Sequence, residues 1–149
     1  MNSVQSWLDA YGDSHQNPIN KKIHWICVPL IMLSLLGLLW PISLESYGYV
    51  NATTVLIFFV SIYYFRLSIS MGIGMLFISF AMLFIINYIN QYELGLIPYL
   101  TIFSISWAGQ FIGHKIEGKK PSFFEDLQFL LIGPLWLLSQ LYNTLKIKY

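Results

Sequence analysis

The chain has 149 residues, which suffices for one compact domain and is short for two. Apolar residues make up 56% of it and charged residues only 10%, whereas a soluble domain carries roughly 25% charged residues. The apolar residues gather in long blocks, which indicates a lipid bilayer, and a net charge of +1 gives no sign of nucleic-acid binding. We therefore expect a single all-α integral membrane domain over residues 1–149.

The N-terminal segment, residues 1–22, is polar and precedes the first apolar block. No apolar stretch lies where a cleavable signal peptide would need it, so the first block is expected to be retained. Four apolar residues recur at helical spacing: Val4, Trp7, Leu8 and Tyr11. They predict a short amphipathic helix over residues 3–11 that ends at Gly12, with aromatic rings suited to a membrane interface.

Residues 23–113 are expected to form four transmembrane helices, since a spanning helix needs about 20 mainly apolar residues. The four blocks are Ile23–Trp40, about Tyr49–Phe65, Met71–Ile89 and Leu96–Gly113. A fifth block, Leu127–Tyr142, is short and contains Gly133-Pro134. Proline removes a helical hydrogen bond, so residues 127–149 are expected to be a broken helix, either a kinked span or a re-entrant pair of half-helices.

Two local patterns add detail to this helical bundle. Gly109 and Gly113 form a small-xxx-small pattern, which lets another helix approach closely and is compatible with a homo-oligomer. Ser122 and Glu125, behind Pro121, fit a capping box and predict a helix start there.

Lysine and arginine residues set the expected orientation, because they are enriched in cytoplasmic loops. They lie in the N-terminal segment, after the second block and in the loop 114–126: Lys21, Lys22, Arg66, Lys115, Lys119 and Lys120. The intervening loops carry only Glu45 and Glu93. We therefore place residues 1–22 and the loop 114–126 in the cytoplasm. Two C-terminal lysines, Lys146 and Lys148, favour a re-entrant fifth block, which would return the tail to the same side.

The three histidines of the chain, His15, His24 and His114, all fall at this cytoplasmic face. Pro18 favours a turn after His15, and Asn20 then shares a helix face with His24. Neutral imidazole is a common ligand of Fe, Zn, Cu and Ni. The three histidines therefore have two interpretations, as ligands of one metal site or as residues with ordinary structural roles.

A metal-bound histidine usually donates its second ring nitrogen to a carboxylate, carbonyl or amide. Five residues near the histidines carry suitable groups: Asp13, Asn17, Asn20, Gln110 and Glu117. Gln110, His114 and Glu117 share a face if the fourth helix continues past Gly113. Glu117 has a second interpretation, as a direct metal ligand beside the histidines.

Two motifs resemble those of the Mpo1-like family. The first is His15-x4-Asn20-x3-His24 followed by Val28-Pro29. The second comprises Gln110-Phe-Ile-Gly113-His114, Glu117-Gly-Lys-Lys-Pro121, Asp126-Leu and Gly133-Pro134. The motifs lie at opposite ends of the chain with a matching hydrophobic layout between them, so the resemblance covers nearly the whole sequence.

The resemblance implies an Fe(II)-dependent dioxygenase that uses O2 to shorten 2-hydroxy fatty acids by one carbon, a step of fatty-acid α-oxidation. It implies that His15, His24 and His114 hold the iron, with Asn20 and Glu117 as further catalytic residues. Many members of the family carry additional histidines, which this chain lacks. Membrane lipid is an expected partner, in a bacterial inner membrane or the endoplasmic reticulum.

Three other functions are alternatives to this one. A non-catalytic membrane scaffold fits the glycine pattern and the 17% aromatic content, and a metal-dependent lipid hydrolase would fit zinc in place of iron. A transporter is disfavoured, because its ionisable residues near mid-membrane are missing from the apolar blocks.

Overall fold

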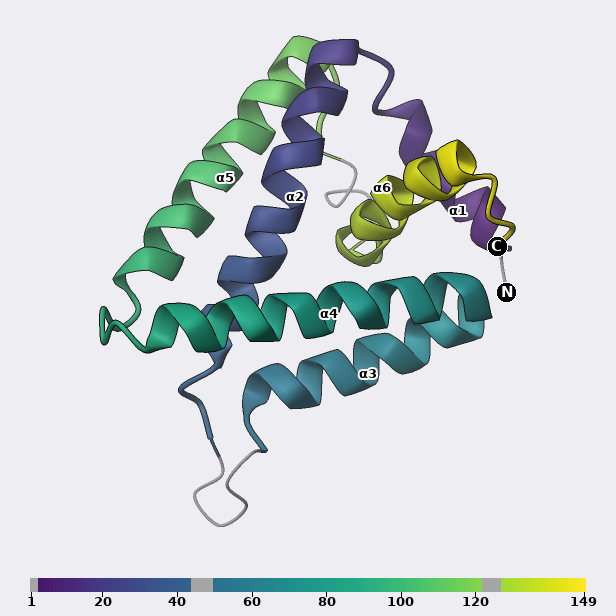
Figure 1. Cartoon of the computed structure of the whole chain (residues 1–149). Helices are drawn as coiled ribbons and strands as arrows, with labels where there is room; N and C mark the ends of the chain where they lie inside the picture. Colours follow the sequence, from purple (N-terminus) through teal and green to yellow (C-terminus); the bar gives the residue numbers. More distant parts are fainter. Residues whose placement is uncertain (1–2, 44–49, 122–126) are drawn as a thin grey trace.

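A computed structural model describes residues 3–43, 50–121 and 127–149. These residues form six helices (Figure 1): α1 (Val4–Asp13), α2 (Pro18–Leu39), α3 (Ala52–Leu67), α4 (Ile69–Asn90), α5 (Ile97–Glu117) and α6 (Phe129–Leu145). Within the described ranges there is no named β-strand. The expected all-α class is therefore confirmed. The proposed capping box at Ser122 and the loop position of Glu45 lie outside the described residues.

Two of the described helices, α2 and α4, are long and apolar enough to cross a membrane by length and composition. Each has 22 residues, with mean hydropathies of 1.9 and 2.4. α3 and α6 are apolar but have 16 and 17 residues. The length and composition expected of a transmembrane helix are thus met by two helices rather than four.

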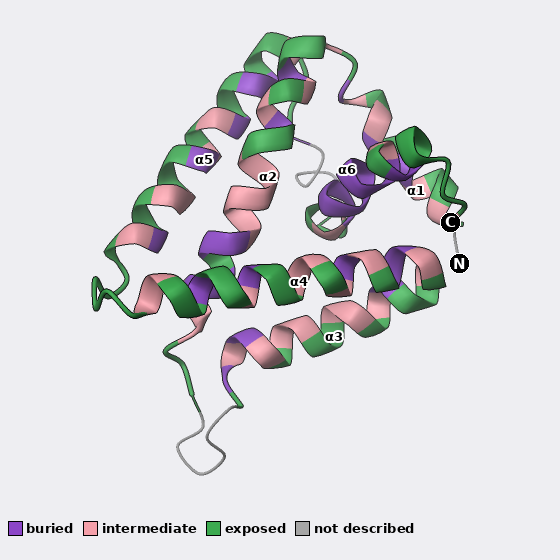
Figure 2. Ribbon diagram, viewed as in Figure 1, coloured by how far each residue is buried: buried purple, intermediate pink, exposed green. Residues whose placement is uncertain are grey.

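α2 and α5 lie side by side and antiparallel, and the α3–α4 hairpin passes across them (Figure 1). α1 packs against α6 on the other side of α2, and the two chain ends lie near each other. Figure 2 shows that buried residues gather on the sides of the helices that face one another. α6 is the most enclosed helix, since every residue from Ile132 to Ser139 is buried.

The small-xxx-small pattern on α5 makes the predicted close helix contact, and its partner is α2. A Cβ atom at Gly109 would lie 2.7 Å from the sulfur of Cys27, and one at Gly113 would overlap the side-chain oxygen of Asn20. Any larger residue would push the helices apart. This contact fixes how α5 is positioned along α2. It therefore also fixes the relative positions of the side chains at the ends of these two helices.

Three helix boundaries extend beyond the expected ones. α1 continues through Gly12 to Asp13. α2 begins at Pro18, because Asn17 caps it and proline suits the first helical position. α5 continues to Glu117 and stops at Gly118, whose φ of 74° is a left-handed helix end. Residues 114–117, expected in a loop, are therefore helical.

α6 differs from the expected broken helix, because it runs continuously from Phe129 to Leu145 with Pro134 inside it. Proline cannot donate to the carbonyl four residues earlier, so a gap opens in the hydrogen-bond ladder. The hydroxyl of Tyr64 donates to the carbonyl of Leu131 at 2.9 Å, beside that gap. Packing on all sides thus supports one helix, and two separate half-helices do not occur.

Candidate metal centre

His15 lies in the short linker between α1 and α2, with its side chain fully buried. Its ring stacks on Tyr11, one helical turn earlier, with centroids 4.1 Å apart and an interplanar angle of 11°. Its Nδ1 lies 2.6 Å from the carbonyl oxygen of Tyr11. The end of α1 therefore fixes both the position and the orientation of this imidazole.

His24 and His114 reach the same point from α2 and α5. His24 is fully buried in the second turn of α2, with its Nδ1 3.0 Å from the carbonyl oxygen of Asn20. His114 is buried in the last turn of α5, beside the close contact at Gly113. Its Nδ1 has no hydrogen-bond partner among the described residues.

The three rings form one cluster. Their centroids are 4.3 Å apart for His15 and His24, and 5.0 Å apart for each of the other two pairs. One nitrogen from each ring can be chosen so that all three atoms lie within 4.8 Å of one another. The structure therefore brings together the three histidines that the sequence places at one face, and such a set could bind a metal ion.

The hydrogen bonds of the cluster favour a bound cation. A carbonyl oxygen only accepts, so Nδ1 of His15 and Nδ1 of His24 must donate to their carbonyls, which leaves Nε2 unprotonated in each neutral ring. These two Nε2 atoms are 2.9 Å apart, so their lone pairs face and repel each other. Burial is the main cause that lowers the pKa of His15 to about 3, which disfavours a proton shared between the two rings. A metal ion would satisfy both nitrogens together with the unpartnered one of His114.

Glu117 ties the end of α5 to the start of α2. One carboxylate oxygen accepts from the backbone N–H of Gln16 at 2.8 Å. The other accepts from the N–H of Asn17 at 2.9 Å and from the side-chain amide of Asn20 at 3.0 Å. Burial alone would raise the pKa of Glu117, but these three hydrogen bonds outweigh it and hold the pKa below its usual range. The ionised carboxylate thereby fixes the linker that carries His15.

The remaining polar candidates from the sequence take different positions. Asn20 is fully buried, donates to Glu117 and accepts from His24 through its backbone. The side chain of Asn17 caps α2 by accepting from the N–H of Ile19 at 2.8 Å. Asp13 takes part through its backbone oxygen, which accepts from Lys119 at 2.7 Å. Gln110 is buried one turn before His114, and its amide nitrogen has no partner in the part of the chain described.

Two aromatic residues of the site were not predicted as part of it. The sequence pattern predicts Tyr11 at the membrane interface and Trp136 in the fifth apolar block. The ring of Trp136 lies 5.3 Å from that of His15 and 5.5 Å from that of Tyr11. The four-residue spacing of Tyr11 and His15 was an available signal, whereas no local pattern could bring Trp136 to the histidines.

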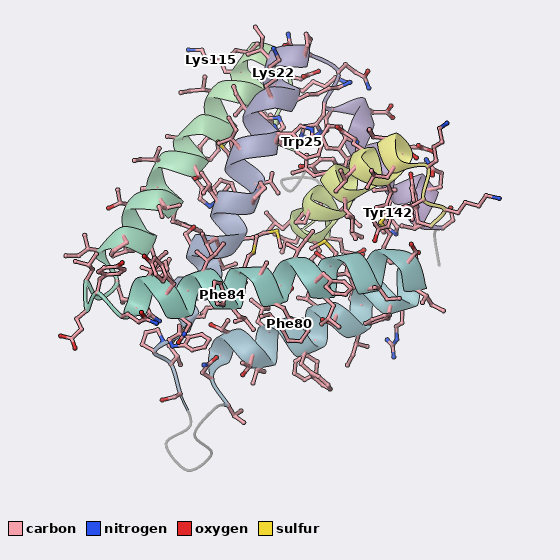
Figure 3. The ribbon with its side chains drawn as sticks, in the orientation of Figure 1. Lys22, Trp25, Phe80, Phe84, Lys115 and Tyr142 are labelled. Carbon is pink, nitrogen blue, oxygen red and sulfur yellow. The ribbon has the colours of Figure 1, made fainter. Side chains whose placement is uncertain are left out.

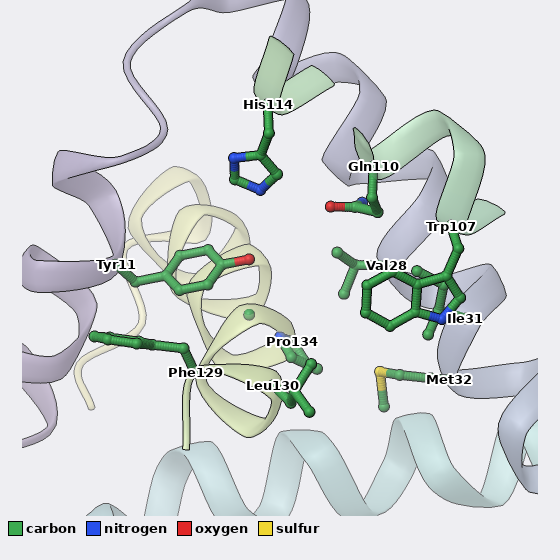
Figure 4. Close-up of a pocket in the computed structure, with 11 residues that line it drawn as sticks. Tyr11, Val28, Ile31, Met32, Trp107, Gln110, His114, Phe129, Leu130 and Pro134 are labelled. Carbon is green, nitrogen blue, oxygen red and sulfur yellow. The ribbon is translucent and has the colours of Figure 1, made fainter. Parts of the chain in front are cut away.

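A small pocket of about 70 Å³ opens beside His114 (Figure 4). Its polar lining comes from Tyr11, Gln110 and His114, and the rest of its wall is apolar: Val28, Ile31, Met32, Trp107, Phe129, Leu130, Gly133 and Pro134. Figure 4 shows the Tyr11 hydroxyl and the Gln110 amide extending into the space below His114. A small polar group could therefore enter beside the histidines.

Residues 1–145 match the family described as 2-hydroxy-palmitic acid dioxygenase Mpo1-like. The chain belongs to the Mpo1-like family. One member, the 2-hydroxy-palmitic acid dioxygenase MPO1 of Saccharomyces cerevisiae, is 31% identical over 142 residues, which cover 92% of this chain and 78% of the yeast protein. No solved structure matches. The resemblance to the Mpo1-like family that the two histidine motifs indicate is thus confirmed over residues 1–145.

Proposed function

We propose that the chain is an Fe(II)-dependent dioxygenase that cleaves 2-hydroxy fatty acids to fatty acids one carbon shorter. The observation that carries this proposal is the cluster of three buried histidines with two facing lone pairs. Membership of a family described by a 2-hydroxy-palmitic acid dioxygenase supports the substrate class. O2 alone balances the reaction, because a 2-hydroxy acid plus O2 gives the shorter acid, CO2 and water.

In this proposal His15, His24 and His114 hold the iron through one ring nitrogen each. Iron bound there would supply the redox chemistry for breaking the bond between carbons one and two, and three protein ligands would leave room for the substrate and O2. The carbonyls of Tyr11 and Asn20 keep the rings of His15 and His24 in the tautomer that a metal needs. Tyr11 and Trp136 cover His15 and exclude water from its ring.

Asn20 and Glu117 act in this proposal as positioning residues. Glu117 is ionised and holds the linker through three hydrogen bonds. Asn20 connects that carboxylate to α2 one turn before His24. The loss of either would let the imidazole of His15 move relative to the other two.

We further propose that residues 1–149 form one membrane domain with four transmembrane helices, α2 to α5. Lys22 and Lys115 lie at the end where α2 begins and α5 ends, which is also the histidine end (Figure 3). Lysine favours the cytoplasmic side, so the site would face the cytoplasm, in a bacterial inner membrane or the endoplasmic reticulum. Large aromatic side chains such as Phe80 and Phe84 project outward from α4 and are 61% and 75% exposed, as lipid-facing residues would be (Figure 3).

The test is metal analysis of the purified protein, followed by O2 consumption with 2-hydroxypalmitate. Palmitate is the matched control, since it lacks only the hydroxyl that would contact the metal. We expect one iron per chain and O2 uptake with the hydroxy acid alone. Bound zinc without O2 uptake would favour a lipid hydrolase, and a protein that binds no metal would favour a scaffold.

A further inference from the structure

A second, larger pocket lies next to the one beside His114. It has a volume of about 390 Å³, within the range of about 300–1,000 Å³ that is typical of small-molecule sites. Residues of α2, α3, α4, α5 and α6 line it, and most of them are apolar. Two of its polar groups have hydrogen-bond partners, since the hydroxyls of Tyr64 and Ser79 donate to the carbonyls of Leu131 and Met75.

The two pockets share part of their walls. Five residues line both of them: Ile31, Met32, Trp107, Leu130 and Pro134. The combined space therefore has polar groups with free hydrogen-bonding capacity at the histidine end, where the amide nitrogen of Gln110 is unpartnered. Away from that end the lining is apolar. Such a space suits a molecule with one polar head and a long hydrocarbon tail.

The direction of the larger pocket follows α2. It extends along α2 to Leu36, twelve residues past His24, which corresponds to about 18 Å of helix. The start of α3 closes this end, because the hydroxyl of Thr53 donates to the carbonyl of Leu36 at 2.6 Å. Leu56, one turn later on α3, also lines the pocket.

We propose that the larger pocket holds the hydrocarbon tail of the substrate, and that its wall at Leu36 and Leu56 sets the longest chain accepted. This inference rests on the proposed function, which supplies a straight-chain 2-hydroxy acid as the occupant. The polar head lies beside His114 and Gln110, and the tail passes Met32 and Trp107 into the pocket between α2, α3 and α4. Leu56 and Ser79 are therefore specificity-determining residues.

The test compares two variants that change the pocket in opposite directions. Ser79→Leu fills it and should shift the preference to shorter acids, whereas Leu56→Ala enlarges the far end and should shift it to longer ones. Displacing two methylene groups of the tail from the pocket should change the relative affinity about fifteenfold, since each buried methylene contributes roughly fourfold. Each variant has a matched control on the outer face of the same helix: Ala81→Leu on α4 and Phe58→Ala on α3, both exposed positions.

The measurements are the affinities for 2-hydroxydodecanoate, 2-hydroxypalmitate and 2-hydroxybehenate, by calorimetry in nanodiscs, and O2 uptake with the same acids. Opposite shifts in the affinity series, with both controls unchanged, would support the pocket even if no O2 were consumed. O2 uptake with an unaltered chain-length profile in both variants would overturn the pocket and leave the proposed function intact. If Ser79→Leu does not fold, the chain-length preference of Leu56→Ala alone tests the pocket: a shift to longer acids supports it, and no shift overturns it.

Discussion

Replacing Gly113 with alanine should weaken both the fold and the metal site, because this glycine sets the distance between α2 and α5. The new Cβ would overlap the side-chain oxygen of Asn20 and lie 3.4 Å from a methyl group of Ile23. Asn20 cannot turn away freely, since its amide is held by Glu117 at 3.0 Å. Either that hydrogen bond breaks or α5 shifts outward and takes His114 with it.

The size of the effect follows from two opposing contributions. Alanine is favoured over glycine inside a helix by about 1 kcal/mol, whereas an inserted methyl group in a tight contact costs about 1–3 kcal/mol. Gly12→Ala is the matched control, because its Cβ would meet Trp136 at an ordinary 3.4 Å. Gly113→Ala should therefore be less stable than Gly12→Ala by about 1–3 kcal/mol.

The assay is chemical unfolding in detergent followed by tryptophan fluorescence, together with anaerobic Fe(II) titration. Gly113→Ala should lose about 10–100-fold in metal affinity, as changes next to metal ligands do, and Gly12→Ala should lose none. Adding Asn20→Ala removes the overlapping atom, so the double variant should be more stable than the sum of the single changes predicts. Equal stability and equal metal affinity of both glycine variants would refute the reasoning.

The remaining predictions concern the ligands, the positioning carboxylate, pH and topology. Replacing any one of His15, His24 and His114 with alanine should abolish iron binding, measured by mass spectrometry. Membrane insertion of the protein should stay unchanged. Glu117→Gln should reduce metal affinity or activity by about 10–100-fold, and a loss as complete as that of a histidine variant would make Glu117 a ligand. Burial lowers the pKa of His15 from 6.5 to about 3, so the unfolded chain takes up the proton first as pH falls. The metal-free protein should therefore lose stability between pH 6.5 and 3, by about 1.4 kcal/mol per pH unit per such group; a profile unchanged by His15→Ala would contradict this. Cysteines introduced at Lys119 and Glu93 in a Cys27→Ser background should be labelled from opposite sides of the membrane, and labelling from one side would overturn the proposed topology.

Much of the site could be predicted because its members are rare and lie at the ends of apolar blocks. The only three histidines fall at one expected membrane face, and a four-residue spacing puts Asn20 beside His24. The close contact of α5 with a neighbouring helix could be predicted from Gly109 and Gly113, since two small residues four apart let another helix approach closely. The contact partner could not be predicted, because nothing in α5 alone distinguishes α2 from α4.

The features that sequence reasoning missed depend on tertiary packing. The continuity of α6 through Pro134 goes with burial of every residue from Ile132 to Ser139, and the Tyr64 hydroxyl that contacts the Leu131 carbonyl beside the proline comes from 67 residues away. Helix α5 was expected to end at Gly113 because apolar character fades there. It ends instead at Gly118, where the backbone adopts a positive φ, and a hydropathy pattern does not detect that difference. The two pockets likewise arise between several helices, four for the smaller and five for the larger, so the pattern of a single segment cannot predict them.

The three histidines come from three separate elements, and this connects the chemistry of the site to the packing of the fold. His15 belongs to the linker after α1, which packs on α6, whereas His24 and His114 belong to the α2–α5 pair. A metal ion held by all three would join these two halves at the point where Glu117 already spans them through Gln16 and Asn17. The pockets lie between the same halves, because both are lined by α2, α5 and α6. A substrate whose tail lies between the halves would therefore present its polar head to the metal, at a place where Glu117 joins the two halves. The head would stay fixed there, while the length of the apolar tail could vary.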